Sequence, residues 1–224
     1  MKDAIPFQAY DFSRKTHPYS AVSLLHEKLI PCSKPFSLPA DDTYNLSPNT
    51  NESALILMTS GIYSYCHAES DLYIATGFSP GVIGLVDGYS LYYNVEERPK
   101  HYIVAETVCV GHLVPIENFL RCADEFELWH DISRILAHRL MVMSARESEI
   151  VGVDSYTTVR ALLSELWMYP EYYRNQINVE KFIHRRSGLS RSQIMRLLSD
   201  LKKGGYLDIA MGKLINVGKL PRSY

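Results

Sequence analysis

Short apolar runs, each closed by turn residues, dominate the pattern of hydrophobic and polar positions between residues 53 and 115. They recur at intervals near ten residues, and their separators include Ser79-Pro80-Gly81 and Asp87-Gly88. Apolar and β-branched runs of this length, bounded by Gly, Pro and Asp, are typical of β-strands. The expected strands are 54–58, 62–65, 72–76, 82–86, 91–95, 102–105 and 108–114. Their spacing predicts a compact barrel or jelly roll.

A helical spacing of three to four residues replaces the strand pattern after residue 123. Asp124 and Glu127 form a capping-box-like start for a helix that runs to about Ile150. Its apolar stripe consists of Leu128, Ile132, Ile135, Leu136, Leu140 and Met143. Roughly 25 residues would span ~37 Å, which is longer than a small domain needs. We therefore predict that the stripe faces a second subunit; the alternative is that it packs only on the chain's own barrel.

Two further helices are indicated on either side of these segments. Residues 1–50 are rich in Pro, Ser, Asn and Asp, and they predict a loosely structured lead-in with one short helix at 21–29. Another helix starts at Asp154, carries apolar residues at helical spacing and ends before Pro170.

The last forty residues contain the pattern of a winged helix-turn-helix. A short helix at 179–186 is followed by the turn Ser187-Gly188-Leu189, and Ser190 then opens a second helix with Gln193 completing a capping box. Gly204-Gly205 stops that helix, and residues 206–210 and 213–217 flank Met211-Gly212 as a hairpin. This order of elements predicts a nucleic-acid-binding module.

Charge divides the chain at the same place as the hydrophobic pattern. Residues 179–224 hold ten Lys and Arg against three acidic residues, a formal charge of +7. The remainder holds 13 Lys and Arg against 22 Asp and Glu, a formal charge of −9. A basic appendage on an acidic body is the electrostatic footprint of an attached nucleic-acid-binding domain.

Roles for the polar residues of this module follow from the geometry of recognition helices. The N-terminal part of such a helix enters the major groove, where arginine can bond bidentately to guanine, so Arg191 and Arg196 are assigned to base reading. Ser192 and Gln193 would read or orient beside them, and Ser190 would cap the helix and reach a phosphate. The residues assigned to phosphate contacts are Arg185, Arg186, Lys202, Lys203 and Lys213.

Composition narrows the remaining classes of protein. The 224 residues are 46% hydrophobic and 21% charged, which indicates a globular protein, most simply of two domains. The sequence has no apolar run near the ~18 residues that cross a bilayer and no signal-peptide pattern, so we expect a cytoplasmic protein without a membrane segment. Four scattered cysteines and the lack of metal-binding or catalytic motifs predict no metal site, no cofactor, no catalytic residues and no enzyme.

The order of barrel, long helix and winged helix-turn-helix resembles the Crp/Fnr superfamily of bacterial transcription regulators. The most specific part of the resemblance is 188–198, followed by 201–207 and the wing at 211–215. The resemblance implies that Ser190, Arg191 and Arg196 contact DNA, whereas Ser192 replaces a common Glu and leaves the base preference open. A closer similarity, carried by 84–88, 103–106, 154–162, 184–186 and 217–224, is to the enterobacterial inhibitors of hydrogen peroxide resistance. It implies a homodimeric regulator of the oxidative-stress response.

The sequence departs from the nucleotide-binding members of the superfamily. Those members hold the ribose and phosphate through a Gly-Glu pair and a later Arg-Ser or Arg-Thr, whereas this chain has Gly84-Leu85 and Pro99-Lys100, with Arg98 displaced by one position. A buried ribose hydroxyl without a partner would cost ~1–3 kcal/mol. These residues argue against cyclic AMP, and we expect the glycines at 81–88 to form β-turns.

Direct sensing of peroxide by a thiol is a separate hypothesis. Cys122 follows Arg121 at an expected helix start, where both would favour the thiolate, although nearby acidic residues oppose it. Haem is a weaker alternative. It would be bound by His67, His101, His112 or His130 in the sensory half of the chain, but no motif surrounds any of these histidines. A third alternative is a partner-interaction module that binds DNA without sequence preference.

Taken together, the patterns predict an α+β protein with a cyclic-nucleotide-binding-like β-roll in residues 1–122, a dimerisation helix in 123–152 and a winged helix-turn-helix in 153–224. We expect a homodimer that binds double-stranded DNA at a palindromic operator, with RNA polymerase as a possible further partner. We expect that the β-roll has lost the residues that bind cyclic AMP. The alternative is a regulator that uses the β-roll to sense a ligand or a redox change.

Overall fold

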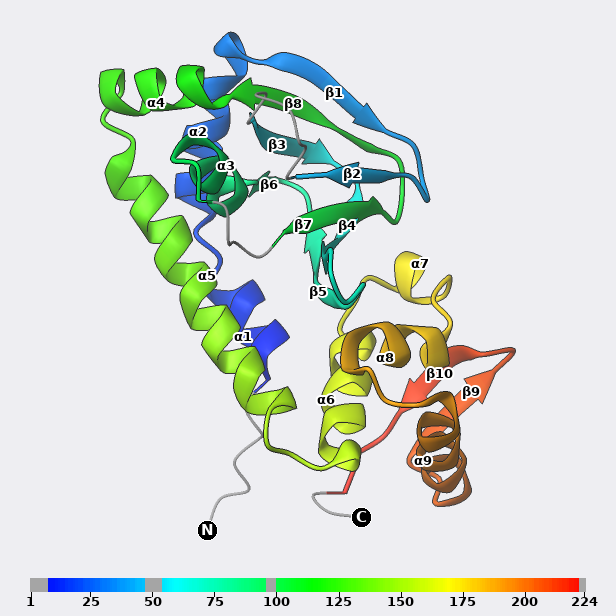
Figure 1. The fold of residues 1–224 in the computed structure, drawn as a ribbon. Helices are drawn as coiled ribbons and strands as arrows, with labels where there is room; N and C mark the ends of the chain where they lie inside the picture. The colour runs from blue at the N-terminus through cyan, green and yellow to red at the C-terminus, as the bar shows by residue number, and fades with distance from the viewer. Residues whose placement is uncertain (1–7, 47–53, 96–99, 222–224) are drawn as a thin grey trace. The chain divides into compact units, whose positions relative to one another are not determined.

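The computed structural model describes residues 8–46, 54–95 and 100–221 (Figure 1). Contacts divide the chain into two units: residues 18–137 form one, and the described part of 1–17 forms the other together with 138–221. Among the described residues, no helix has the length and apolarity needed to cross a bilayer.

Two four-stranded antiparallel sheets form a β-roll in the first unit. One sheet has the order β1-β8-β3-β6 and the other has the order β2-β7-β4-β5. The strands are β1 (Lys34–Leu38), β2 (Thr43–Asn45), β3 (Ala54–Ser60), β4 (Ile62–His67), β5 (Tyr73–Phe78), β6 (Gly81–Ile83), β7 (His101–Ala105) and β8 (Cys109–Pro115). The mixed α+β fold with an N-terminal β-roll, expected from the sequence, is confirmed.

Strand β3 is buried on both faces, which explains why it is a continuous apolar run. Ile56 and Met58 belong to the core that also contains Tyr63 and Ile103 of the other sheet. Leu55 and its neighbours on the opposite face belong to a second core, formed with the helices of this unit. Because side chains alternate along a strand, each face of β3 supplies a different core.

Helices cover the second face of β3. They are α2 (Tyr19–Leu29) with the short 3₁₀ turn η1 (Ile30–Cys32), α3 (Leu85–Tyr92), α4 (Ile116–Glu125) and the first part of α5 (Trp129–Ile150). Leu25 of α2, Phe119 of α4 and Ile132 of α5 are all less than 5% exposed in the same core as Leu55 and Leu57. This core fixes α2 and α4 side by side.

Two expectations for this unit were wrong. Residues 85–92, expected as turns and strand, form helix α3, which begins at Gly84 with a left-handed φ of 87°. Gly88 packs so closely that an added Cβ would lie 3.3 Å from Ile116 Cδ1, so packing rather than local pattern selects the helix here. The expected strand at 91–95 is likewise not a strand.

The start of the long helix also differs from the expectation. Asp124 lies in the last turn of α4, and its carboxylate accepts a hydrogen bond from Trp129 Nε1 at 2.7 Å. Glu127 has a left-handed φ of 53°, so the chain turns between α4 and α5 and does not begin a helix at Asp124. The expected long helix therefore starts at Trp129 instead of Asp124.

The second unit combines the end of α5 with six shorter elements and the N-terminal helix. Its elements are α1 (Ala9–Thr16), α6 (Ser155–Trp167), α7 (Glu171–Arg174), α8 (Val179–Ser187), α9 (Arg191–Lys203), β9 (Leu207–Ala210) and β10 (Lys213–Val217). Helix α1, in the expected loose lead-in, is anchored by Ala9 N, which donates to Glu149 Oε1 at 2.8 Å, and by the Tyr10 ring, 5.0 Å from that of Tyr169. The expected winged helix-turn-helix is confirmed.

Candidate nucleic-acid interface

The turn between α8 and α9 is shaped by a glycine and by two hydrogen-bonded caps. Gly188 ends α8 with a φ of 68°, a left-handed conformation that costs glycine little. The N–H of Gly188 donates to His184 O at 3.1 Å, and the His184 ring contacts Leu189 O through Nδ1 at 2.8 Å. These bonds set the angle at which α9 leaves the turn.

Ser190 and Gln193 form the predicted capping box at the start of α9. Gln193 N donates to Ser190 Oγ at 3.3 Å, and Ser190 N donates to Gln193 Oε1 at 3.1 Å. The amide oxygen of Gln193 is thereby occupied at the cap rather than directed along the helix face. The capping box therefore fixes the first turn of α9.

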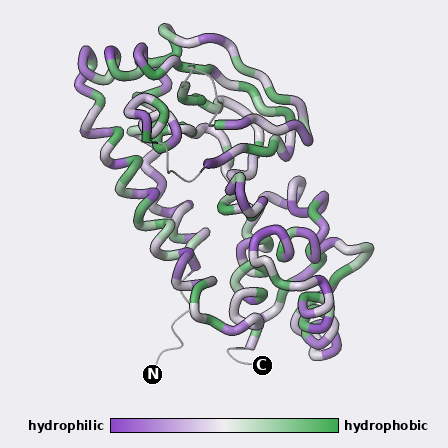
Figure 2. The backbone as a smooth tube through the Cα atoms, in the orientation of Figure 1, coloured by the Kyte–Doolittle hydropathy of each residue, from purple (hydrophilic) through white to green (hydrophobic). Residues whose placement is uncertain are grey.

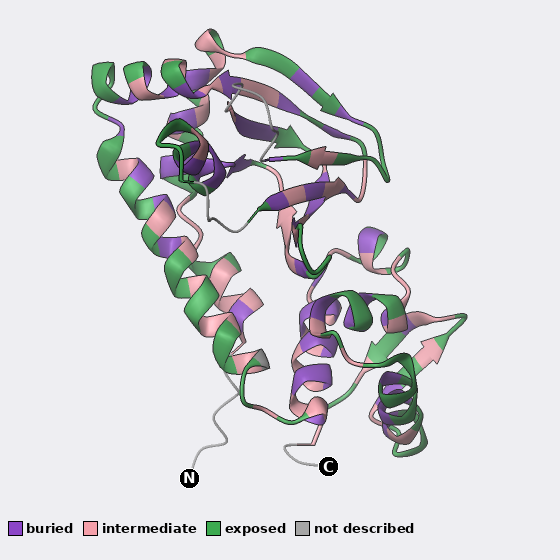
Figure 3. Ribbon diagram, in the orientation of Figure 1, coloured by how far each residue is buried: buried purple, intermediate pink, exposed green. Residues whose placement is uncertain are grey.

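Helix α9 buries its leucine and isoleucine side chains and exposes its arginines, with Met195 as an exposed apolar residue between them. Ile194, Leu197, Leu198 and Leu201 are buried against the other helices of the unit, whereas Arg191, Ser192 and Arg196 are exposed (Figures 2 and 3). The Arg191 side chain is 79% exposed, with Glu180 Oε2 3.8 Å from its Nε. An ion pair this exposed contributes little and can open readily.

The residues predicted to contact phosphate differ in their exposure to solvent. Arg185, Lys202 and Lys203 are exposed, and Lys202 Nζ donates to the wing carbonyl of Ile209 at 3.0 Å. Lys213 is half-buried and donates to Gln176 O.

Arg186 lies on the inner side of α8 instead of beside Arg185. Its side chain is part of the buried set, and its guanidinium carbon lies 3.9 Å from the centre of the Phe182 ring. Adjacent helical residues point about 100° apart, since a turn holds 3.6 residues, and Arg186 falls on the side of α8 that also carries the buried Phe182 and Ile183. The placement of Arg186 indicates packing rather than a phosphate contact.

The wing is tied to the start of α8 at a tight turn. Met211 and Gly212 have φ values of 50° and 75°, the pair of positive angles that defines the favoured two-residue hairpin turn. The N–H of Val179 donates to Gly212 O at 2.9 Å, and a Cβ at Gly212 would lie 2.5 Å from Asn178 Nδ2. Glycine is needed there for both conformation and space.

Helix α5 carries only part of the stripe predicted for dimerisation on an open face. Leu128, Ile132 and Ile135 are buried in the chain's own core, and Leu136 packs against it. Leu140 and Met143 are 68% and 61% exposed. Three further residues of α5, which the apolar pattern missed, are exposed in a four-three-four spacing with Leu140: Ser133, Ala137 and Ser144. Their small size hid this face, because the prediction looked for large apolar side chains.

Cys122 lies where the sequence argument did not expect it. It is in the last turns of α4, at the negative end of the helix dipole, so the helix does not favour a thiolate there. Burial, followed by a hydrogen bond with Cys32, raises the pKa of Cys122 to about 11. Arg121, expected to favour the thiolate, pairs with Glu125 at 3.2 Å.

The β-roll holds a buried polar cluster that sequence reasoning missed. Asp87 of α3 is 1% exposed; its Oδ2 accepts from the Tyr65 hydroxyl at 2.9 Å, and its Oδ1 lies 3.0 Å from His101 Nδ1. The rings of Tyr65 and His101 stack with centroids 4.7 Å apart. Leu85, which stands where nucleotide-binding regulators place a ribose acceptor, is buried in the apolar core.

Known proteins resemble this chain in sequence and in fold. Residues 155–222 match the family described as winged helix-turn-helix DNA binding. The inhibitor of hydrogen peroxide resistance from Salmonella typhimurium is 26% identical over 189 residues, 84% of this chain and 88% of that protein. The protein of the same name from Escherichia coli K12 is 28% identical over 178 residues, 80% and 83% of the two chains.

Solved structures share the whole architecture at low sequence identity. The c-di-GMP-responsive global regulator CLP of Xanthomonas campestris matches with a TM-score of 0.71 at 18% identity, covering 88% of this chain and all of that one. A putative Crp/Fnr-family regulator from Eubacterium rectale matches with a TM-score of 0.65 at 15% identity, covering 84% and 87%. The chain has the fold of the Crp/Fnr regulators, carries a winged helix-turn-helix DNA-binding domain, and is similar over most of its length to the inhibitors of hydrogen peroxide resistance.

Proposed function

We propose that this chain is a homodimeric transcription regulator that reads DNA sequence through α9 and acts in the response to hydrogen peroxide. The observation that carries the proposal is the exposed basic face of a helix whose first turn is already fixed. Arg191 and Arg196 leave this face with long, exposed side chains, which can reach base edges in the major groove. Lys202 and Lys203 at the other end of α9 are suited to phosphates.

A second copy of the chain supplies the symmetry that such regulators use. The stripe of Ser133, Ala137, Leu140 and Ser144 is exposed, and the small side chains beside Leu140 allow two helices to approach closely. An approximate four-three repeat is the spacing at which two α-helices pack along one seam. Two recognition helices related by a twofold axis would read half-sites about one turn of DNA apart, ~34–36 Å, so the operator is a palindrome.

The β-roll of this regulator does not bind cyclic AMP in our proposal. Leu85 is packed into the apolar core, and a leucine offers no acceptor to a ribose hydroxyl. Both carboxylate oxygens of Asp87, on the same helix, already have partners in Tyr65 and His101. Arg98, displaced from the phosphate-pairing position, lies outside the described residues.

The test is fluorescence anisotropy of the full chain with the DNA upstream of its own gene and with a shuffled duplex of equal length, across a range of salt. The Arg191→Ala/Arg196→Ala variant should bind its specific site at least ~10-fold more weakly than the wild type, since each good arginine–guanine pair contributes about 1–3 kcal/mol. The matched control is Arg14→Ala/Lys15→Ala, which removes the same charge from exposed positions of α1. Its affinity should stay near that of the wild type.

Equal binding of both duplexes, with the same steep salt dependence, would contradict sequence reading and favour a partner-interaction module that associates with DNA nonspecifically. The link to peroxide is tested separately in Escherichia coli that lacks its own inhibitor of hydrogen peroxide resistance. Expression of the wild-type chain should lower survival in hydrogen peroxide, and expression of Arg191→Ala/Arg196→Ala should not. Unchanged survival with both chains would contradict the proposed role.

A further inference from the structure

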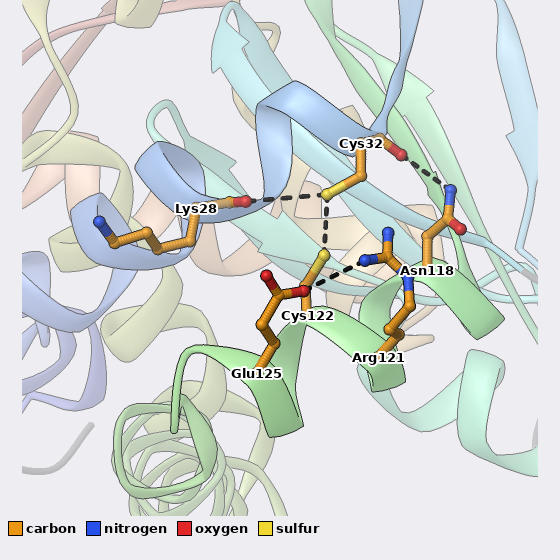
Figure 4. A network of polar contacts seen from close by, with 6 residues as sticks. All are labelled: Lys28, Cys32, Asn118, Arg121, Cys122 and Glu125. Atoms are coloured by element: carbon orange, nitrogen blue, oxygen red, sulfur yellow. Dashed lines mark hydrogen bonds and ion pairs between the residues drawn. The ribbon is translucent and has the colours of Figure 1, made fainter.

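Two cysteines that are far apart in sequence meet between α2 and α4. Cys32 ends the η1 turn after α2, Cys122 lies on α4, and their Sγ atoms are 2.8 Å apart (Figure 4). Both residues belong to the same unit of the fold. Because a disulfide places its sulfurs about 2.05 Å apart, bonding would require the sulfurs to approach by less than an ångström.

The backbone around the pair is held in place on both sides. Asn118 Nδ2 of α4 donates to Cys32 O at 3.0 Å, and the thiol of Cys32 donates to Lys28 O at 3.8 Å. Leu29 and Phe119, which precede the two cysteines on their own segments, are both buried in the shared core. The two thiols are therefore positioned by the packing of α2 against α4, not by a chance contact of mobile side chains.

The two other cysteines offer no such arrangement. Cys66 is fully buried and its thiol donates to Ser64 O, and Cys109 is fully buried with its thiol near Ile62 O at 3.4 Å. Burial, followed by the charge of Glu106, raises the pKa of Cys109 to about 11. These residues serve as internal controls in the same unit.

We propose that Cys32 and Cys122 are a redox pair that a hydroperoxide converts into a reversible disulfide. The thiolate of Cys32 attacks one oxygen of the peroxide, the O–O bond breaks, and the departing hydroxide takes a proton to become water. Cys32 is then a sulfenic acid. The sulfur of Cys122 attacks the sulfenic sulfur, the S–O bond breaks, and hydroxide leaves with the proton of Cys122 as a second water. Two thiols and one hydrogen peroxide give one disulfide and two waters, a two-electron oxidation.

The exposure of the two residues assigns these roles. Cys32 is half-buried and is therefore the more accessible residue of the pair, whereas Cys122 is 1% exposed. The raised pKa of Cys122 keeps it a thiol, which suits the resolving partner rather than the residue that meets the oxidant first. The sequence argument names Cys122 as the candidate for direct sensing, whereas our proposal assigns the first reaction to Cys32 and the second to Cys122.

The disulfide would restrict the movement of α4 relative to the segment that follows α2. It would join the end of α2 to the last turns of α4, which lead through a tight turn at Phe126 and Glu127 into α5. A cross-link there constrains the start of the helix that carries the exposed stripe. Reduction would remove the constraint.

The experiment counts the thiols of the full reduced chain, under denaturing conditions, before and after hydrogen peroxide. Two of the four thiols should be lost and should return with dithiothreitol. Digestion without reductant should yield one linked pair of peptides, containing Cys32 and Cys122, lighter by two hydrogens than the separate peptides. Retention of four thiols, or a linkage to Cys66, to Cys109 or between chains, would overturn the proposal.

Variants separate the two roles. Cys32→Ser should form no disulfide, whereas Cys122→Ala should retain a sulfenic acid at Cys32 that dimedone labels. Cys66→Ala, the matched control, should lose two thiols like the wild type. If dimedone labelled Cys122 in Cys32→Ser but not Cys32 in Cys122→Ala, the assigned order would be wrong. The peptide linkage is read in the wild type, so a variant that fails to fold leaves the main test intact, and none of these measurements depends on DNA binding.

Discussion

In the winged helix, Arg191 and Arg196 project from α9 into solvent, whereas in the β-roll the carboxylate of Asp87 is 1% exposed and both its oxygens have partners. The first arrangement keeps charge available for a partner molecule. The second uses a charge internally, to hold β4, β7 and α3 together. Polar residues are thus left available for binding in one region and contribute to the architecture in the other, and exposure is what distinguishes them.

The largest effect should come from removing the buried charge. In Asp87→Ala, the Tyr65 hydroxyl and the His101 ring lose their partner inside the β-roll, so the free energy of unfolding should fall by about 3 kcal/mol. The matched control is Asp208→Ala at an exposed wing position, which should change stability by less than about 0.5 kcal/mol. Urea denaturation of both variants measures the difference. Equal midpoints would mean that the Asp87 cluster contributes nothing to stability.

A smaller effect should distinguish two neighbouring arginines in the winged helix. Arg186→Ala removes a buried side chain stacked on Phe182, and we expect a loss of about 2 kcal/mol in stability. Arg185→Ala should leave stability nearly unchanged and weaken binding to every duplex alike. Thermal denaturation and anisotropy on both variants test this. If Arg185→Ala destabilised the chain more than Arg186→Ala, the division of α8 into inner and outer faces would be wrong.

Helix α5 likewise has a buried face and an exposed face, and measurements of dimerisation can test the exposed one. Ala137→Asp places a charge in the exposed stripe, and it should raise the dissociation constant of the homodimer at least ~10-fold through like-charge repulsion and desolvation. Met143→Asp, which lies off that stripe but in the set predicted from the apolar pattern, should have a smaller effect. Sedimentation equilibrium measures both. The reverse order would restore the predicted apolar stripe as the dimer contact.

The smallest effect concerns the anchoring of α1. Burial lowers the pKa of His17, with the charges of His138 and Arg139 adding to the shift, and burial also lowers the pKa of His138. Below about pH 6.5, the ordinary pKa of histidine, the unfolded chain therefore binds more protons than the folded chain. The free energy of unfolding should fall as the pH drops below that value, and it should level off below the lowered pKa values of the two histidines. His138→Gln should flatten this dependence.

Urea midpoints between pH 7.5 and 5.5 measure the effect, with the exposed His130→Gln as control. Burial raises the pKa of Glu149, which acts in the opposite direction by contributing stability at low pH, so the readout is the difference between variant and wild type. An identical pH dependence in His138→Gln and the wild type would exclude a role for this histidine.

Much of the winged helix could be read from the sequence because its determinants are local. A left-handed glycine, a capping box and a two-residue hairpin turn each depend on residues within a few positions of one another. Gly188, Ser190 and Met211-Gly212 therefore lie where the pattern placed them. The direction of a side chain on a helix is less local, which is why Arg186 was grouped with Arg185.

The sequence by itself determined the order of β-roll, long helix and winged helix-turn-helix, the concentration of positive charge in the last part of the chain and the face of α9 that carries it, since all three depend on composition and short-range spacing. Tertiary structure alone decided that 85–92 is a helix, that Asp87 meets His101 and that Cys32 meets Cys122. No local sequence pattern links residues this far apart in the chain. The contacts arise only when β3 is covered on both faces and brings distant segments together in the two cores.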